Sequence, residues 1–268
     1  MDWRKGLADV RFARFFVADQ IAYGVVEGSE QDPASMTVTA IDGHPFAPFE
    51  MTRAIFPLGD VRLLPPVLPS KVIGIGKNYV EHARESGSEA PTTPVIFLKP
   101  STAVVGSGET VVLPPQSLQV DFEGELAVVI GRLAREVPFD RVNEVVLGYT
   151  CADDVTARDL QASDGQWVRA KGFDSFCPLG PWIVSDIDAS DLAIETTVNG
   201  ETRQSARTSQ MVHSVADLVC FVSSVMTLLP GDVILTGTPA GVGPLSSGDA
   251  VEVTIEGVGT LAHSVAGP

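Results

Sequence analysis

Cysteine is scarce in this chain of 268 residues, and its placement excludes two kinds of site. The three cysteines, Cys151, Cys177 and Cys220, are odd in number and form no C-x-x-C pair. A disulfide framework or a structural zinc site needs paired or closely spaced cysteines. We therefore expect reduced thiols in the core of a cytoplasmic protein.

Basic residues are also few. The sequence has 18 Lys and Arg against 34 Asp and Glu, which gives a formal net charge of −16 at pH 7. Nucleic acids and anionic membrane surfaces attract proteins that present positive charge. This balance argues against both as partners.

Long apolar runs are absent as well. A membrane-spanning helix needs about 20 apolar residues, and the best candidate, Leu218–Leu229, ends at Pro230. The first residues, Met1–Gly6, lack the apolar core of a signal peptide. A G-x-S-x-G motif is also missing, which argues against a serine hydrolase. We expect a soluble, cytoplasmic protein.

Glycine and proline, by contrast, are abundant. The 25 Gly and 19 Pro imply many turns, and 44% hydrophobic residues can supply a large core. This combination favours a mostly β, α+β fold over a helical bundle. Four prolines punctuate residues 56–71. We expect a small amino-terminal β-rich unit at residues 1–63 and a main domain at residues 64–268.

The stretch Val120–Gly131 contains the most informative pair of acidic residues. Its second half is apolar and β-branched, which predicts a buried strand. Because side chains alternate along a strand, Glu123 and Glu125 point to the same face. Two buried carboxylates repel each other, and a divalent cation is the usual compensating charge. An exposed strand start, with both acids in water, is the alternative.

A third carboxylate follows the next predicted strand, residues 145–151. Either Asp153 or Asp154 could complete a set of three oxygen ligands. Such a set suits Mg²⁺ or Mn²⁺ better than zinc, which prefers His and Cys. The alternative is that one of the two aspartates caps a helix.

A short helix is predicted after the strand at residues 71–75. Asn78 is expected to cap it, with Glu81 completing a capping box. On this helix His82 and Glu85 are three residues apart and share a face, so Glu85 can orient His82 as a base. A simple surface contact is the alternative for this pair.

A nucleotide-binding loop is excluded at the end of the same strand. The segment G-I-G-K at residues 74–77 lacks the third glycine of a dinucleotide fingerprint. Asn78 also stands where a P-loop needs Ser or Thr. We expect the two glycines to permit close approach to the backbone.

Several basic residues accompany these acids. They are Lys77, Arg84, Lys99, Arg158, Arg169 and Lys171. Cations beside a metal suggest an anionic ligand such as a carboxylate, whereas salt-bridged surface charges are the alternative for some of them. The loop at residues 236–243, rich in glycine and hydroxyls, can offer N–H groups to an anion or form only a tight turn.

Taken in order, these motifs resemble the fumarylacetoacetate hydrolase family. They are G-K-N-Y-x-x-H-x-x-E, F-L-K-P-S, D-F-E-G-E-L-A-V-V-I-G, D-D-V-T-A-R-D, K-G-F-D and P-G-D-V-I-L-T-G-T-P-A-G-V-G. The resemblance runs from about Leu64 to the end. It implies a mixed β-sandwich roll, usually a homodimer, that binds Mg²⁺ or Mn²⁺. The small amino-terminal unit is similar to the one that precedes this domain in bacterial members, for which we expect a role in aromatic compound catabolism.

The resemblance also implies roles for particular residues. The implied metal ligands are Glu123, Glu125 and Asp154, the implied catalytic residues are His82, Glu85 and Lys171, and the implied substrate contacts are Gln161 and Thr238. Lys77 stands where many members have Arg. A lysine can still contact a substrate carboxylate, but it cannot form the bidentate pair that an arginine forms. Lys99, at the end of a predicted strand, is a further candidate for substrate binding.

These parts predict metal-dependent hydrolysis of a C–C bond in an acylpyruvate-like 2,4-diketo acid. The metal would hold the substrate carboxylate and 2-oxo oxygen, His82 would deprotonate water, and Lys171 would stabilise the oxyanion. The same enolate would serve two other reactions, which stay open. One is isomerisation of 2-hydroxyhepta-2,4-diene-1,7-dioate, and the other is decarboxylation or tautomerisation of oxaloacetate. A metal-stabilised binding protein is the alternative outside enzymology, but it has no use for a His82–Glu85 pair.

Overall fold

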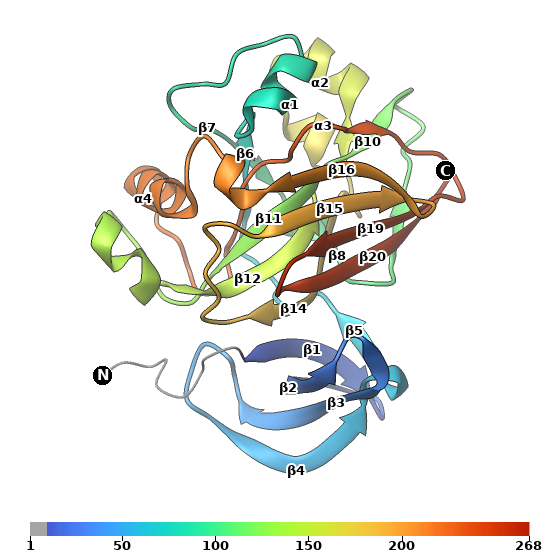
Figure 1. Ribbon diagram of the computed structural model, residues 1–268, viewed down its shortest axis with the longest axis vertical. Helices are drawn as coiled ribbons and strands as arrows, with labels where there is room; N and C mark the ends of the chain where they lie inside the picture. Colours follow the sequence, from blue (N-terminus) through green and yellow to red (C-terminus); the bar gives the residue numbers. More distant parts are fainter. Residues whose placement is uncertain (1–9, 268) are drawn as a thin grey trace.

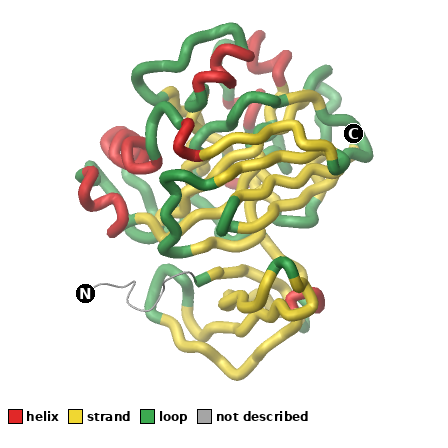
Figure 2. Tube along the Cα trace, in the orientation of Figure 1, coloured by secondary structure: helices red, strands yellow, loops and turns green. Residues whose placement is uncertain are grey.

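The computed structural model describes residues 10–267, and β-strands are its main regular structure (Figure 2). The strands form one 12-stranded sheet, one five-stranded sheet and one three-stranded sheet. Short helices and turns connect them. The predicted mostly β, α+β class is confirmed.

The amino-terminal strands form one end of the large sheet. They are β1 (Arg11–Val17), β2 (Gln20–Ser29), β3 (Asp32–Gly43), β4 (Phe49–Pro57) and β5 (Arg62–Leu64), with the 3-10 turn η1 (Leu58–Asp60) before β5. The apolar segments at residues 10–17 and 21–26 predict a hairpin, which the pairing of β1 with β2 confirms. β1 also pairs with β14 (Cys177–Val184), so the amino-terminal strands continue into the main sheet. The division of the chain after residue 63 stays a prediction.

The centre of the large sheet is buried on both faces. It contains β6 (Val72–Gly76), β11 (Gly124–Ile130), β12 (Val146–Asp153) and β17 (Val233–Leu235). β7 (Val95–Lys99) is the partly exposed edge strand beside β6, and β8 (Val104–Val105) pairs with β14. Alternate side chains of β11 enter two different cores. Leu126, Val128 and Ile130 pack in one, and Ala127 and Val129 pack in the other. This two-sided burial explains the continuous apolar run in the sequence.

The five-stranded sheet lies over the main sheet (Figure 1). Its strands are, in order, β16 (Glu201–Arg207), β15 (Ala193–Val198), β19 (Ala250–Ile255), β20 (Gly259–Ala266) and β9 (Thr110–Val112). The separate three-stranded sheet consists of β13 (Thr156–Ala157), β10 (Val120–Phe122) and β18 (Gly243–Pro244). From the sequence, the apolar alternation at residues 250–255 predicts the last strand of the domain, and this prediction is wrong. β20 follows it, because Leu261, His263 and Val265 alternate inward and extend the same sheet.

The helices gather at two places around the sheets (Figure 1). They are α1 (Val80–Glu85), α2 (Arg158–Asp164), α3 (Val168–Lys171) and α4 (Val215–Val225), with the 3-10 turns η2 (Ser101–Ala103), η3 (Phe139–Glu144) and η4 (Thr208–Gln210). The segment S-V-A-D at residues 214–217 predicts a capping box before an apolar helix through Leu229. The box is confirmed, because Ser214 and Asp217 bond reciprocally. The helix ends earlier, at Val225, because Met226 is already extended.

The predicted helix cap at Asn78 is wrong. α1 begins at Val80, and Tyr79 occupies the cap position without a side-chain bond. The buried Asn78 amide instead donates to Thr236 O at 2.8 Å and His213 O at 3.0 Å, and its oxygen accepts from His213 N at 2.8 Å. A buried amide needs all of its polar atoms satisfied, and tertiary partners supply them here. Asn78 therefore ties the start of α1 to the loop after β17.

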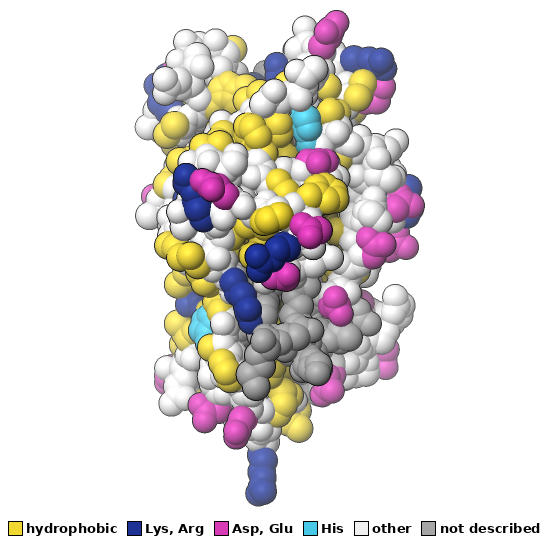
Figure 3. Space-filling view, turned by 90° about the vertical axis from the view of Figure 1, so that its left-hand side faces the viewer, with side chains coloured by type: hydrophobic (Ala, Val, Ile, Leu, Met, Phe, Trp, Pro, Cys, Tyr) yellow, Lys and Arg dark blue, Asp and Glu magenta, His cyan; other side chains and the backbone are white. Residues whose placement is uncertain are grey.

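Acidic side chains are spread over the face shown in Figure 3, and several basic side chains lie beside them. This distribution fits the net charge of −16. Among the described residues, no helix has both the length and the apolar character that crossing a membrane requires.

Gly74 leaves space for aromatic side chains against the backbone of β6. It pairs with Phe97 on β7, and a Cβ at Gly74 would lie 2.1 Å from the Phe97 ring. Phe97 in turn packs edge-on against Trp167, with ring centroids 5.5 Å apart, and lies 4.8 Å from Lys171 Nζ. A Cβ at Gly76 would meet Trp167 at 2.6 Å. The two glycines thus admit aromatic rings to the backbone, which gives the predicted close approach a specific form.

We predict that Gly74→Ala destabilises the protein by about 1–3 kcal/mol, because the added methyl group must displace the Phe97 ring. Gly59→Ala is the matched control, since a Cβ at Gly59 meets nothing within 4 Å. That control should stay within about 0.5 kcal/mol of the parent. Urea unfolding followed by circular dichroism measures both. Equal stability of the two variants would show that Phe97 has free space.

Candidate active site

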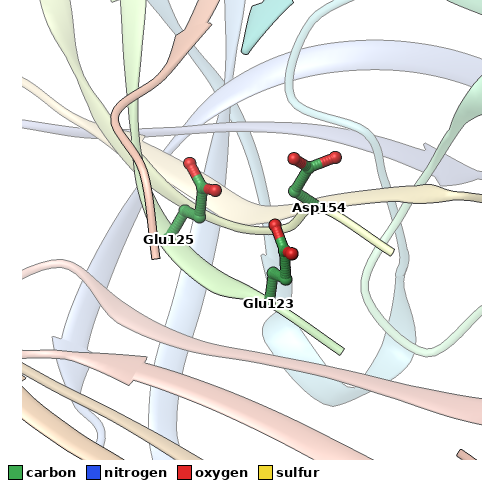
Figure 4. Close-up of side chains that lie close together, drawn as sticks. All are labelled: Glu123, Glu125 and Asp154. Atoms are coloured by element: carbon green, nitrogen blue, oxygen red, sulfur yellow. The ribbon is translucent and has the colours of Figure 1, made fainter. Parts of the chain in front are cut away.

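Three carboxylates meet where β11 begins and β12 ends. Glu123 lies between β10 and β11, Glu125 lies on β11, and Asp154 directly follows β12. One oxygen of each lies within 4.8 Å of the others, and all three residues are buried (Figure 4). The convergence expected for these acids is therefore present in the fold. The set can hold a metal ion.

The two neighbouring aspartates have different surroundings. Asp154 faces the carboxylate cluster. Asp153 points away from it, accepting the Glu123 N–H at 2.7 Å and bonding His263 Nε2 at 2.8 Å. Between the two candidates for a third oxygen ligand, only Asp154 lies in the cluster.

Three buried or half-buried cations neutralise part of the cluster. Lys171 Nζ donates to Glu123 at 2.8 Å and to Asp154 at 2.6 Å. Lys99 Nζ donates to the other Asp154 oxygen at 2.6 Å. Arg158 pairs with Glu123 at 2.5 Å and with Asp121 at 2.7 Å. Low local dielectric makes such pairs strong, but only where every charge has a partner.

Glu125 is the exception within the described part of the chain. It makes no ion pair there, and it accepts one hydrogen bond, from Gly237 N–H at 2.6 Å. Burial, followed by the charges of Asp154 and Glu123, raises the pKa of Glu125 well above its usual value. Burial also acts to raise the pKa of Glu123, but the Arg158 and Lys171 charges outweigh it and hold that pKa far below its usual value. The two glutamates are therefore not equivalent.

His82 lies on α1 with its ring buried against the cluster. Burial is the main cause that lowers the pKa of His82 below its usual value, and the neighbouring Glu123 charge partly opposes it. His82 Nδ1 lies 3.6 Å from Glu85 Oε2 and makes no hydrogen bond with the described residues. Glu85 instead accepts Gly241 N–H, at 3.1 and 3.3 Å to its two oxygens. The predicted pair is thus close but not bonded, and a neutral imidazole is available as a base.

A cavity of about 240 Å³ opens beside these groups. Of the predicted site residues, it is lined by Lys77, His82, Glu123, Glu125, Gln161, Lys171 and Thr238. Of the others, Glu85 lies beside His82 and Asp154 is paired with Lys171, whereas Lys99 reaches the site only through its pair with Asp154. The cavity is therefore a pocket with carboxylates and a lysine at its base and one histidine in its wall.

The polar groups in the wall differ in what they can still bind. The Gln161 oxygen accepts from Arg158 at 3.1 Å, which leaves its amide N–H groups for a ligand. The Thr238 hydroxyl donates to Gly124 O at 2.9 Å and accepts from Gln204 at 2.7 Å. Thr238 can therefore offer a ligand little more than a lone pair. Lys77 has a φ of 60°, a left-handed conformation that is rare for lysine.

Several residues around the site were not assigned roles from the sequence. Trp167 and Ser86 line the cavity, and Arg158 orders Glu123 and Gln161. Arg158 could have been found, since it stands in the D-D-V-T-A-R-D motif. Trp167 stands in the polar turn between α2 and α3 and gives no local signal.

Two family models match the chain. The model for the fumarylacetoacetate (FAA) hydrolase C-terminal domain matches residues 71–266. The model described as Rv2993c-like, N-terminal matches residues 10–66. Together they account for nearly all of the described chain.

Similar proteins carry names of isomerases and tautomerases. Protein Rv2993c of Mycobacterium tuberculosis is 51% identical over 96% of this chain and 98% of its own. The crystal structure named 2-hydroxyhepta-2,4-diene-1,7-dioate isomerase from Mycobacterium marinum has a TM-score of 0.91 and 51% identity, covering 96% of this chain and 98% of that one. Human mitochondrial oxaloacetate tautomerase FAHD2A is 45% identical over 79% of this chain and 71% of its own. Because the FAA hydrolase model matches well over half of the chain, this chain belongs to the fumarylacetoacetate hydrolase family.

Proposed function

We propose that the protein is a divalent-metal-dependent enzyme that converts a small 2-oxo acid through its enolate. The proposed ligands of the metal are Glu123, Glu125 and Asp154. Carboxylate oxygens are the preferred ligands of Mg²⁺ and Mn²⁺, and a set of three leaves positions for water and substrate.

The charge balance of the cluster supports a bound cation. Ion pairs neutralise Glu123 and Asp154, whereas Glu125 has only the Gly237 N–H. An ionised carboxylate that is buried without a cation is costly. A divalent ion between the three residues would supply the missing positive charge, so the residues present fit the metal.

His82 is the proposed base, and this rests on its burial beside the cluster with a free Nδ1. When bound, the metal supplies Lewis-acid stabilisation of the charge that develops on the 2-oxo oxygen. His82 then takes a proton from the carbon beside that group. Because burial lowers the pKa of His82, the imidazole is neutral near pH 7 and ready to accept it. Glu85, 3.6 Å away, stabilises the resulting imidazolium.

Lys171 and Gln161 are proposed to hold the reacting substrate. Lys171 Nζ stands at the base of the cavity between Glu123 and Asp154. Its third N–H can reach a substrate oxygen and stabilise negative charge there. The Gln161 amide has free N–H groups for a second oxygen. Lys77 makes no ion pair with the described residues and is proposed to meet an anionic group at the far end of the substrate.

Keto–enol isomerisation is the reaction that we place first. It needs one base that removes a proton and returns it at another atom of the substrate, and His82 alone can do both. Relatives at 45–51% identity that bear isomerase or tautomerase names support this choice. The substrate would be an oxaloacetate-like or 2-hydroxydienoate-like acid.

Hydrolysis of a C–C bond in an acylpyruvate is the second candidate, and the sequence favoured it. The His82–Glu85 pair supports it, because a histidine beside a carboxylate can also deprotonate water. Lys171 would then stabilise the oxyanion at the attacked carbonyl. Both reactions use the same residues, so rates with defined substrates must separate them.

The first prediction concerns the metal-free protein. Glu125→Gln should raise its melting temperature at pH 7–8 by at least about 2 °C, because it removes an uncompensated buried charge. The raised pKa of Glu125 means that native stability is lost as pH rises from the ordinary carboxyl range through that pKa. The difference between variant and parent should therefore shrink as pH falls toward 4.5, the ordinary value.

Glu123→Gln is the matched comparison, with the opposite expectation. It leaves Arg158 and Lys171 each short of a partner and should cost about 3–5 kcal/mol of unfolding free energy. Scanning calorimetry with chelator present measures both variants. If Glu125→Gln melts below the parent at every pH, Glu125 already has a partner and the charge argument fails. Both variants should also lose Mg²⁺ binding.

The second prediction separates the reactions. The Mg²⁺-loaded protein should tautomerise oxaloacetate, followed by ultraviolet absorbance, with a higher kcat/KM than it hydrolyses acetylpyruvate, followed by pyruvate release. His82→Gln should lower the favoured rate by about 10²–10⁴-fold, the contribution of a general base. His44→Gln, in the turn between β3 and β4, is the control and should change neither rate. Faster hydrolysis would select the second candidate, and full activity of His82→Gln would remove His82 as the base.

A further inference from the structure

The backbone is interrupted at the point that carries the cluster. β10 ends at Phe122 and β11 begins at Gly124, so Glu123 falls in the break. Side chains, not a neighbouring strand, receive the two amide groups there. Glu123 N–H donates to Asp153 Oδ1 at 2.7 Å, and Gly124 N–H donates to Gln204 Oε1 at 3.0 Å.

Asp153 is itself held from the other sheet. Its second oxygen bonds His263 Nε2 at 2.8 Å, and the side chains of both residues are 0% exposed. His263 lies on β20 and its Nδ1 faces Ser264 O at 3.3 Å. The chain of contacts thus runs from the five-stranded sheet through Asp153 to the Glu123 backbone.

Packing alone gives this pair little reason to exist. Apolar side chains of similar volume are often as stable as a buried ionic pair, or more so. Asp153 and His263 are both outside the group of residues that lines the cavity, so they do not touch a ligand there. What the two residues achieve together is to fix the position of the Glu123 amide.

We propose that Asp153 and His263 form a buried positioning pair for Glu123. His263 fixes one oxygen of the Asp153 carboxylate, and the other oxygen fixes the Glu123 N–H. This orientation aims the Glu123 carboxylate at Arg158, Lys171 and the metal. The inference rests on the proposed function only in taking Glu123 as a metal ligand.

The geometry explains what loss of the pair would do. Without Asp153, the buried Glu123 N–H has no acceptor, and the break between β10 and β11 gains freedom. The Gly124–Gln204 bond and the bond from Asp154 N to Glu123 O, at 2.9 Å, would still hold the segment in the fold. We therefore expect a folded protein whose Glu123 carboxylate is no longer held in place. Residues that orient metal ligands typically contribute about 10–100-fold to affinity.

The test is the Mn²⁺ dissociation constant measured by isothermal titration calorimetry, with the metal-free melting temperature recorded for each variant. His263→Leu and Asp153→Ala should raise the constant by about 10-fold or more. His263→Gln, whose amide can still donate to Asp153, should stay within about threefold of the parent. Rescue by this variant separates positioning from simple destabilisation.

Thr208→Val is the matched control. Thr208 is a buried side chain that holds another backbone away from the site, accepting Leu192 N–H and donating to Ala189 O, both at 2.8 Å. This variant should lower the melting temperature and leave the Mn²⁺ constant unchanged. If Asp153→Ala does not fold, the comparison of His263→Leu with His263→Gln decides alone.

Two failures can be told apart with Glu123→Gln. If this variant binds Mn²⁺ as the parent does, the metal site itself is wrong. If Glu123→Gln loses the metal while His263→Leu and Asp153→Ala keep the parent constant within twofold, the site stands and the positioning pair is overturned. Equal losses in His263→Leu and His263→Gln would also overturn it.

Discussion

The site depends on one constraint, which is that carboxylates buried together must each find positive charge. Asp154 has Lys99 and Lys171, and Glu123 has Lys171 and Arg158. These pairs account for all but Glu125, whose charge is met by a single N–H. The imbalance favours a bound cation, and the same low dielectric that makes the uncompensated charge costly would strengthen its attraction for that cation.

That constraint also shapes the elements around the cluster. Its charges come from strand ends, from α2 and α3 and from β7, so the fold must bring the ends of several strands to one place (Figure 1). Burial, which raises the pKa of Glu125, also lowers the pKa of His82 below its usual value. Gly74 and Gly76 on β6 admit Phe97 and Trp167 to the backbone, and Trp167 lines the pocket.

Local patterns predicted much of this. Strand alternation places Glu123 and Glu125 on one face, and family motifs separate Asp154 from Asp153. They could not predict that Glu123 is neutralised and Glu125 is not, because that depends on where Lys171 and Arg158 reach in space. The cap expected at Asn78 failed for a similar reason, since a buried amide took tertiary partners. His263 lies 110 residues from Asp153, and no spacing in the sequence could link them.

The most direct measurement is anomalous diffraction from crystals grown with Mn²⁺. The account predicts one strong peak with oxygens of Glu123, Glu125 and Asp154 at about 2.1 Å, a distance typical of hard divalent ions. Lys171 and Lys99 should stay paired to the carboxylates at its edge. A map without a peak among these three residues, at Mn²⁺ concentrations that saturate activity, would contradict the account.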